Sequence, residues 1–299
     1  MSRQKGMVIT MKIKYYGTGA GYGLPEIFCD CRICHHAREA GGKNIRTRSQ
    51  AVLDGQLAID LSVDTFHHSA FCGLDMRKIH HVLVTHNHHD HFFTTDLFSR
   101  VRNMAEPVHF YISEASGQGV RALVEKYEAE IAAGKRDPHA WTRAVVHTLE
   151  YFKPVKILDY TVTPLPARHG KGLDPMIFAI QSEAGNILWG HDTGKFYPET
   201  AQWLKDSGIV FDFVSLDCTL RRGAQITPSH MDLDWCIETA AQLRENGNAN
   251  ENTKFVLSHI GHLVDRTHDE LTCEAAEVGM IAAYDGMEIE FGRKKEEQK

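Results

Sequence analysis

Short apolar runs separated by polar turns recur along this chain, and they have the length and residue types of β-strands. The expected strands cover 11–16, 50–53, 57–61, 82–85, 155–165, 176–181, 186–190, 211–217, 255–258 and 287–291. Asp54 and Gly55 stand between two of these runs, and this pair is typical of a tight hairpin turn. The segment 50–61 is therefore predicted to form a β-hairpin.

Amphipathic segments lie between many of the expected strands. From 115 to 133 the apolar side chains recur at helical spacing, as at Val120, Val124 and Ile131. Further helices are expected at 198–206, 232–245 and 268–283, with a less regular one at 135–150. The stretch 110–150 has no obvious ligand cluster, and we interpret it as a helical insertion that could cap the rest of the domain.

Strands open both halves of the chain and helices are interspersed, which favours an α/β (α+β) sandwich over a doubly wound parallel sheet. The 299 residues fit one large domain or two smaller ones, and we expect a single domain over 1–299. The net charge of −6 offers no basic excess for nucleic acid, so a nucleic-acid partner is not expected. No apolar run is long enough to cross a membrane, and the first residues lack an apolar signal core, so we expect no membrane partner and a cytoplasmic protein.

Histidine is unusually frequent, with 19 residues against 14 phenylalanines, and six of them fall between His80 and His91. Within this cluster His86 and His88 follow an expected buried strand, so both side chains can point to the same side and share one metal ion. Asp90 and His91 come where the chain turns, and can face a second metal. A solvated histidine run is the alternative, but it does not explain the residues downstream.

Three later segments each place a metal-ligand type of residue directly after an expected strand. These residues are His169, Asp192 and His259. Loops at strand ends are common positions for metal-binding and catalytic groups. The sequence therefore predicts that these loops contribute to the same site as the histidine cluster.

A second candidate metal site has a different chemistry. Cys29, Cys31 and Cys34 offer three thiolates within six residues, and a fourth ligand would complete a tetrahedral zinc site. His262 is the best candidate, because it lies three residues after His259 and can point away from the other site. The alternative is that the cysteines are reduced and bind no metal; a disulfide scaffold is not expected in a long chain with seven cysteines.

The motif H-x-H-x-D-H at 86–91, followed by His169, Asp192 and His259, resembles the metallo-β-lactamase superfamily. The resemblance runs from about residue 11 to about residue 262 and implies a four-layer αββα sandwich with a two-metal site at one edge. It implies two sets of ligands that share a carboxylate: His86, His88 and His169 for one metal, Asp90, His91 and His259 for the other, with Asp192 bridging both opposite a hydroxide.

Such a site favours hydrolysis of an anionic substrate. Five neutral imidazoles and two carboxylates leave two divalent ions with a charge of about +2, which suits a phosphodiester. The histidine and carboxylate ligands suit Zn or Mn, with Fe or Ni also open. Members of the superfamily with two-iron redox chemistry carry a glutamate where this chain has His88, which disfavours that chemistry, while one-iron oxygenases remain an alternative.

The cysteine motif narrows the resemblance to two branches of the superfamily. One contains the cyclic phosphodiesterase of the carbon–phosphorus lyase pathway, which opens phosphoribosyl 1,2-cyclic phosphate; the other contains accessory proteins of cofactor biosynthesis, often with incomplete ligand sets. The complete set here favours the phosphodiesterase branch, although the long 100–150 segment departs from it. This resemblance also implies a homodimer.

His230 is the remaining candidate catalytic residue. It precedes an expected helix in Thr227-Pro-Ser-His-Met231, and the resemblance implies that it protonates the leaving oxygen. A histidine with only local hydrogen bonds at the helix start is the alternative. We expect a hydrolase in which His230, Asp90 and Asp192 are catalytic and which opens a small cyclic phosphate or phosphoribosyl ester. A lactonase or other ester hydrolase, an RNA-processing nuclease and a non-catalytic metal-binding protein are the other candidates.

Overall fold

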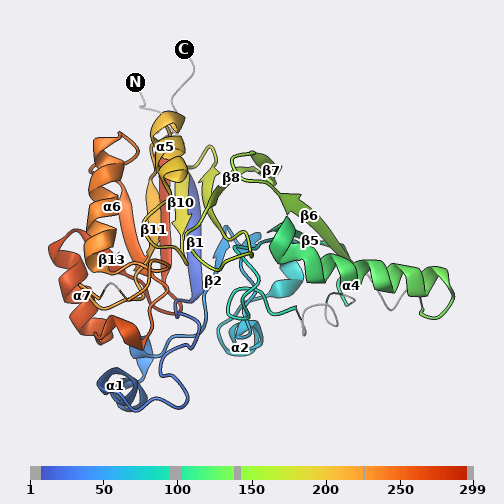
Figure 1. The fold of residues 1–299 in the computed structure, drawn as a ribbon, viewed down its shortest axis with the longest axis horizontal. Coiled ribbons are helices and arrows are strands. Elements are labelled where there is room, and N and C mark those ends of the chain that lie inside the picture. Colours follow the sequence, from blue (N-terminus) through green and yellow to red (C-terminus); the bar gives the residue numbers. More distant parts are fainter. Residues whose placement is uncertain (1–7, 95–100, 102, 138–142, 225, 295–299) are drawn as a thin grey trace, which may run out of the picture.

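The structure is a computed structural model that describes residues 8–94, 101, 103–137, 143–224 and 226–294 (Figure 1). Two sheets, each with seven of the described strands, dominate it. The first sheet has the order β14-β1-β2-β3-β4-β5-β6. Its strands are β1 (Val8–Gly17), β2 (Gln50–Leu53), β3 (Leu57–Ile59), β4 (His81–Leu83), β5 (Val108–Ser113), β6 (Ala144–Leu149) and β14 (Glu288–Lys294). In this sheet order, neighbouring strands are antiparallel from β14 to β3 and parallel from β3 to β6.

The second sheet has the order β13-β12-β11-β10-β9-β8-β7. Its strands are β7 (Val155–Ile157), β8 (Tyr160–Pro166), β9 (Met176–Gln181), β10 (Asn186–Gly190), β11 (Phe213–Asp217), β12 (Lys254–Ser258) and β13 (Met280–Ala282). Strands β7 to β10 are antiparallel, and β10 to β13 are parallel. The carboxyl ends of β10, β11 and β12 therefore meet at one edge of the sheet.

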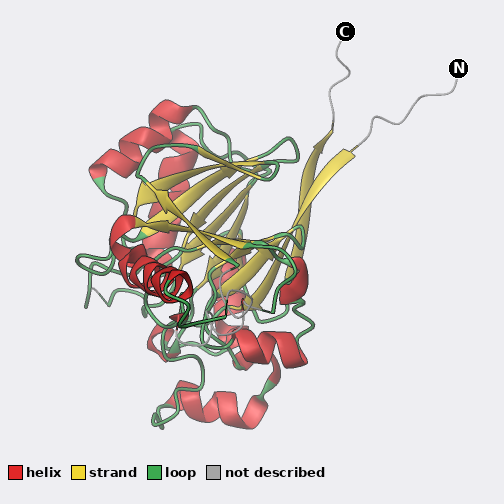
Figure 2. Cartoon of the chain, turned by 90° about the vertical axis from the view of Figure 1, so that its right-hand side faces the viewer, coloured by secondary structure: helices red, strands yellow, loops and turns green. Residues whose placement is uncertain are grey.

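Helices cover the outer faces of the sheets, while strands fill the middle of the molecule (Figure 2). The helices are α1 (Arg32–Ala40), α2 (Thr65–Phe71), α4 (Glu114–Ala132), α5 (Pro198–Ser207), α6 (Leu233–Glu245) and α7 (His268–Glu277), with 3₁₀ turns at Gly42–Asn44, Met76–Lys78 and His262–Val264. Helices α5, α6 and α7 lie with the second sheet, and α4 extends from the first (Figure 1). No helix of the described ranges is long and apolar enough to span a membrane.

Three apolar cores separate these layers. Side chains of β3 show the division, because Leu57 and Ile59 enter the core between the sheets while Ala58 enters the core under the outer helices. The alternation follows from the two-residue period of a strand. The central core also contains Phe178 and Trp189 from the second sheet. The layer order is thus αββα, as the sequence predicted.

Three of the expected elements are wrong in part. The strand expected at 155–165 is two strands, β7 and β8, joined by a turn at Leu158 and Asp159. The helix expected at 135–150 is not helical at 135–137, its residues 138–142 lie outside the described ranges, and 144–149 forms β6, where β-branched Val145 and Val146 suit an extended strand. The segment 110–150 therefore contains the expected helix, α4, between two parallel strands that continue the first sheet. The helix expected at 268–283 ends at Glu277, and Gly279 with φ of +71° leads into β13.

Three further elements were not expected from the sequence. These are α1, α2 and β5. Helix α1 has a mostly polar sequence and buries only Ile33, Cys34 and Ala37. Its apolar stripe is thus too short for periodicity to reveal it.

Candidate metal-dependent active site

The expected ligands of the two-metal site all lie in loops that follow strands. His86, His88, Asp90 and His91 follow β4, His169 follows β8, Asp192 follows β10 and His259 follows β12. Parallel pairing brings the carboxyl ends of β10 and β12 to one edge of the second sheet. The loop after β4 is joined to this sheet by a hydrogen bond of 3.0 Å from the Met176 amide to the Thr85 carbonyl. The topology therefore gathers distant segments at one place.

The first ligand cluster contains His86, His88, His169 and Asp192. His86 Nε2 lies 2.8 Å from His88 Nδ1, and His169 Nε2 lies 3.2 Å from the same atom. One ligand atom from each of the four residues lies within 4.8 Å of all the others. This is the set that the resemblance assigned to the first metal, together with the bridging carboxylate.

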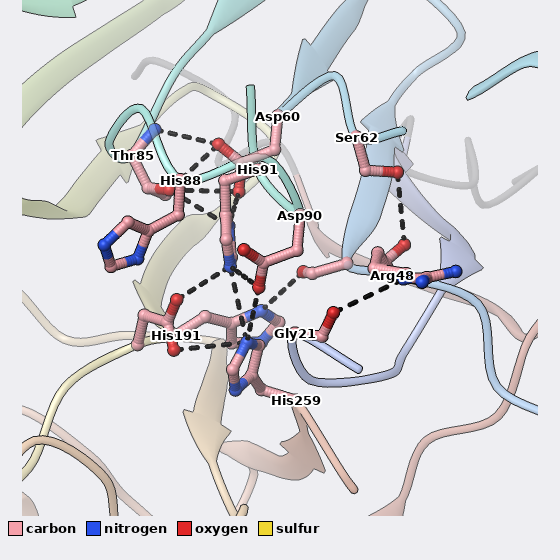
Figure 3. A network of polar contacts seen from close by, with 12 residues as sticks. Gly21, Arg48, Asp60, Ser62, Thr85, His88, Asp90, His91, His191 and His259 are labelled. Atoms are coloured by element: carbon pink, nitrogen blue, oxygen red, sulfur yellow. Dashed lines mark hydrogen bonds and ion pairs between the residues drawn. The ribbon is translucent and has the colours of Figure 1, made fainter. Parts of the chain in front are cut away.

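The second cluster contains Asp90, His91, Asp192 and His259 (Figure 3). Asp90 Oδ2 lies 3.3 Å from His91 Nε2 and 3.9 Å from His259 Nε2. The two imidazole nitrogens are themselves 3.3 Å apart. All four residues are buried, with at most 5% of their surface exposed.

Asp192 belongs to both clusters. Its Oδ2 atom lies 2.7 Å from His91 Nε2 and 3.4 Å from His86 Nε2, and its Oδ1 atom lies 3.1 Å from His259 Nε2. Oδ1 is buried and accepts no hydrogen bond in the described part of the chain. A buried carboxylate oxygen without a donor, surrounded by imidazole nitrogens, fits a site for divalent metal ions.

Three residues of this region have left-handed backbone conformations. The φ angles of Asp60, Asp192 and His259 are +64°, +49° and +56°. Such conformations are unfavourable for residues other than glycine and persist where the surroundings enforce them. The fold therefore holds these side chains in position at some cost in backbone energy.

Polar partners orient the ligand imidazoles from behind. Asp60 Oδ2 accepts from His91 Nδ1 at 2.6 Å, and Thr219 Oγ1 lies 2.9 Å from His259 Nδ1. Such contacts fix the ring orientation of a metal ligand. Asp64, which is close to Asp60 in the sequence, instead forms an ion pair with Arg48 at 3.1 Å.

Asp217 is a candidate functional residue that the sequence did not reveal. Its Oδ2 atom accepts a hydrogen bond from His230 Nδ1 at 2.9 Å, and it lies 3.4 Å from His259 Nδ1. His230 Nδ1 also lies 3.4 Å from Asp192 Oδ1. The only hint in the sequence was that Asp217, like Asp192, comes at the end of a strand.

The Asp217–His230 pair perturbs the protonation of both groups. Burial alone would lower the pKa of His230, but the Asp217 and Asp192 carboxylates together outweigh it and hold that pKa above its usual value. Conversely, burial would raise the pKa of Asp217, and His230 and His259 together hold it below its usual range. An imidazole paired in this way through Nδ1 keeps Nε2 as the nitrogen that can exchange a proton.

Close packing of two loops brings His230 to the ligand clusters. Gly194 follows Asp192 by two residues, and a Cβ atom there would overlap the carbonyl oxygen of Pro228. Only glycine allows the backbone before His230 to approach this closely. The residues around the clusters then enclose a pocket of about 340 Å³, to which His230 contributes a partly exposed side chain.

The cysteine site also assembles as expected. His262 Nδ1 lies 3.1 Å, 3.7 Å and 3.6 Å from the sulfur atoms of Cys29, Cys31 and Cys34. Tetrahedral zinc with Zn–S near 2.3 Å and Zn–N near 2.0 Å would give separations of roughly 3.5 Å, so the donor set fits a zinc ion. Glu26 Oε2, which the sequence did not reveal, lies 3.2 Å from His262 Nε2 and orients the ring.

The fold agrees with comparisons to known proteins. A diphosphatase of the PhnP family is 22% identical, with a TM-score of 0.70, and the match covers 95% of this chain and 98% of that one. Zn²⁺-bound PqqB from Methylobacterium extorquens is 16% identical (TM-score 0.65; 93% and 99% covered). The short form of human tRNase Z is 17% identical (TM-score 0.61; 93% and 98% covered). At these identities the likeness concerns the fold.

Sequence comparison gives the family. A curated octanoyltransferase from Porphyromonas gingivalis is 23% identical over 284 residues, which are 93% of this chain but 51% of the relative. The chain thus spans about half the length of that curated relative. The family model described as the β-lactamase superfamily domain matches residues 57–260, more than half of the chain. This protein therefore belongs to the metallo-β-lactamase superfamily.

Proposed function

We propose that this protein is a two-metal phosphodiesterase that opens a small cyclic phosphate or phosphoribosyl ester. The observation that carries the proposal is the position of Asp192, which belongs to both ligand clusters, next to His230 with its buried Asp217 partner. Asp192 Oδ2 lies 3.4 Å from His86 Nε2 of the first cluster and 2.7 Å from His91 Nε2 of the second, and Oδ1 lies 3.1 Å from His259 Nε2 of the second. Hydrolysis of a phosphodiester needs both an activated water and a proton for the leaving oxygen. The clusters support the first need, and the Asp217–His230 pair supports the second.

Divalent ions held by the two clusters would supply Lewis-acid polarisation of the phosphoryl group and would lower the pKa of water. The protein residues would do the rest. Asp192 and Asp90 carry the negative charge that holds both cations in a buried site. Zn or Mn is our proposal for these positions, with Fe or Ni as alternatives, and a structural Zn for the cysteine site.

His230 would act as the general acid. Its Nδ1 atom is occupied by Asp217, so Nε2 is left to deliver a proton. As the P–O bond to the leaving group breaks, the oxygen takes the proton from Nε2, and the neutral imidazole is then recharged from solvent through the open pocket. Asp217 keeps the ring orientation and stabilises the protonated form, which makes it a positioning residue.

Several further properties stay proposals. We propose a small anionic substrate rather than nucleic acid, a cytoplasmic location and a homodimer. The net charge of −6 supports the first of these. Light scattering of the purified protein tests the dimer.

The proposed activity is tested with bis(p-nitrophenyl) phosphate, with and without added Mn²⁺ or Zn²⁺. We expect metal-dependent release of p-nitrophenol that is lost in Asp192→Ala. Esters and lactones of carboxylic acids are measured in parallel, because the lactonase alternative predicts faster turnover of these. A metal-loaded protein that hydrolyses neither class would overturn the proposal and favour a non-catalytic metal-binding role.

A further inference from the structure

Large apolar side chains stand exposed around the mouth of the metal-site pocket. Tyr22, Ile226 and Leu263 are 64%, 68% and 43% exposed, and all three line this pocket. Single exposed apolar residues are ordinary, but three around one polar pocket mark a place where an apolar group binds. They come from three separate loops, so proximity in sequence does not explain their grouping.

The pocket offers little for a second anionic group. Among its described lining residues there is no lysine or arginine. Arg48 lies behind the loop of Tyr22, but it pairs with Asp64 and donates to the Gly21 carbonyl. Arg222, in the loop that leads to Ile226, pairs with Asp234 at 2.7 Å. The positive charge of the pocket would come from the metal ions and His230 alone.

The apolar side chains are fixed relative to the ligand clusters. A Cβ atom at Gly21 would lie 3.3 Å from Asp90 Oδ2, so the backbone next to Tyr22 borders the second cluster. Leu263 directly follows His262, which the cysteine site holds. A group bound between Tyr22 and Leu263 would therefore lie beside the metal ions that Asp90 and Asp192 would hold.

From this arrangement we infer that Tyr22, Ile226 and Leu263 form a binding subsite for a flat, uncharged organic group of the substrate, such as a nucleobase or another aromatic ring. The substrate would then carry one phosphodiester and no further phosphate near it, which favours the small cyclic phosphate of the proposed function over a phosphoribosyl ester. Tyr22 supplies a face for stacking, and the two aliphatic side chains cover the edges of the ring. The inference rests on the proposed function, because it concerns the substrate of that same site.

Binding of small phosphate esters to the metal-loaded protein tests the subsite by calorimetry. Methyl phosphate, phenyl phosphate and 1,4-phenylene bisphosphate differ in the apolar group and in charge. Phenyl phosphate should bind at least about fivefold more tightly than methyl phosphate, since stacking on an aromatic side chain contributes on this scale. The bisphosphate should bind no more tightly than phenyl phosphate.

Variants locate the effect. Tyr22→Ala should bring the affinities for phenyl and methyl phosphate to within about twofold, while Tyr22→Phe should keep the difference, because the ring and not the hydroxyl is used. Phe71→Ala is a matched control, since Phe71 is 76% exposed on α2 and does not line the pocket. Leu263→Ala is a second probe that should reduce the preference in part.

The outcomes separate this inference from the proposed function. Equal affinities for methyl and phenyl phosphate, or a preference for phenyl phosphate that survives Tyr22→Ala, would overturn the subsite. Tighter binding of the bisphosphate would overturn the uncharged character of the group. Turnover of bis(p-nitrophenyl) phosphate in the same preparation tests the phosphodiesterase activity independently of these affinities.

Discussion

Asp217 Oδ2 accepts a hydrogen bond of 2.9 Å from His230 Nδ1, and the carboxylate is fully buried. The other oxygen, Oδ1, accepts from the backbone amides of Thr219 and Met231, both at 3.1 Å. The carboxylate is thus held from two sides, which fixes the ring of His230. The pair resembles other imidazole–carboxylate arrangements in which the acid positions the histidine rather than taking its proton.

The first prediction concerns this pair and the leaving group. His230→Ala should reduce kcat by about 10²-fold or more for an alkyl leaving group, which needs a proton, and much less for p-nitrophenolate, which does not. Asp217→Asn should show the same dependence with a smaller loss. Rates are measured for a methyl and a p-nitrophenyl diester at equal metal content. Equal losses for the two leaving groups would remove the general-acid role.

The second prediction concerns the approach of the two loops. Gly194→Ala should displace the Pro228 backbone and with it His230, because the added Cβ atom has no space. We expect a loss of kcat for alkyl leaving groups while the metal content is kept. Gly119→Ala is the control, since Gly119 lies within α4 with nothing near its added Cβ; it should stabilise the fold by up to about 1 kcal/mol. Full activity of Gly194→Ala would show that this contact does not set the position of His230.

The third prediction concerns the cysteine site. Cys31→Ser should release about one equivalent of zinc per chain and lower the melting temperature, because a structural zinc site contributes directly to folding. The metal at the other clusters should remain. Cys273→Ser is a matched control at an exposed cysteine outside the site. Metal analysis by mass spectrometry decides, and unchanged zinc content in Cys31→Ser would mean that the cysteines hold no metal.

The fourth prediction concerns pH and stability. Burial lowers the pKa of His68 to about 4 in the fold, where its ring contacts Thr47 and Gln50. In the unfolded state His68 binds a proton near pH 6.5, whereas in the folded state it does so only near pH 4. The contribution of neutral His68 to the free energy of unfolding is therefore complete above pH 6.5 and is lost as the pH falls toward 4. From pH 7.5 to 5 this loss is about 2 kcal/mol.

His68→Gln removes that titration. The difference in unfolding free energy between wild type and His68→Gln should therefore shrink by about 2 kcal/mol between pH 7.5 and 5, measured by urea denaturation at constant metal loading. Other buried histidines titrate in both proteins and cancel in the difference. A difference that does not change with pH would contradict the neutral state of His68.

The sequence identified the candidate ligands, which the structure brings together, because their spacing repeats a recognisable order at strand ends. His86 and His88 alternate along the backbone, and Asp192 and His259 each follow a buried apolar run. Asp217 could not be predicted in the same way. Its role depends on packing between β11 and the loop before α6, which no local pattern encodes.

The same limit applies to the fold. Strong apolar runs identified most strands and favoured an α/β sandwich, whereas the layer order αββα was implied by the resemblance of the ligand motifs to the metallo-β-lactamase superfamily. The segment 135–150 was misread because β6 pairs with β5 at the edge of the sheet, so its burial pattern lacks a clear period. Glu26 was missed because its partner His262 is distant in sequence.

The central claim is that Asp192 lies between two metal ions. Anomalous diffraction from crystals of the protein loaded with Mn²⁺ or Zn²⁺ tests it most directly. We predict two peaks, one on each side of the Asp192 carboxylate and roughly 3.5–4 Å apart, with a separate zinc peak among Cys29, Cys31 and Cys34. A single peak beside Asp192, or none, in protein that hydrolyses bis(p-nitrophenyl) phosphate would contradict the two-metal account.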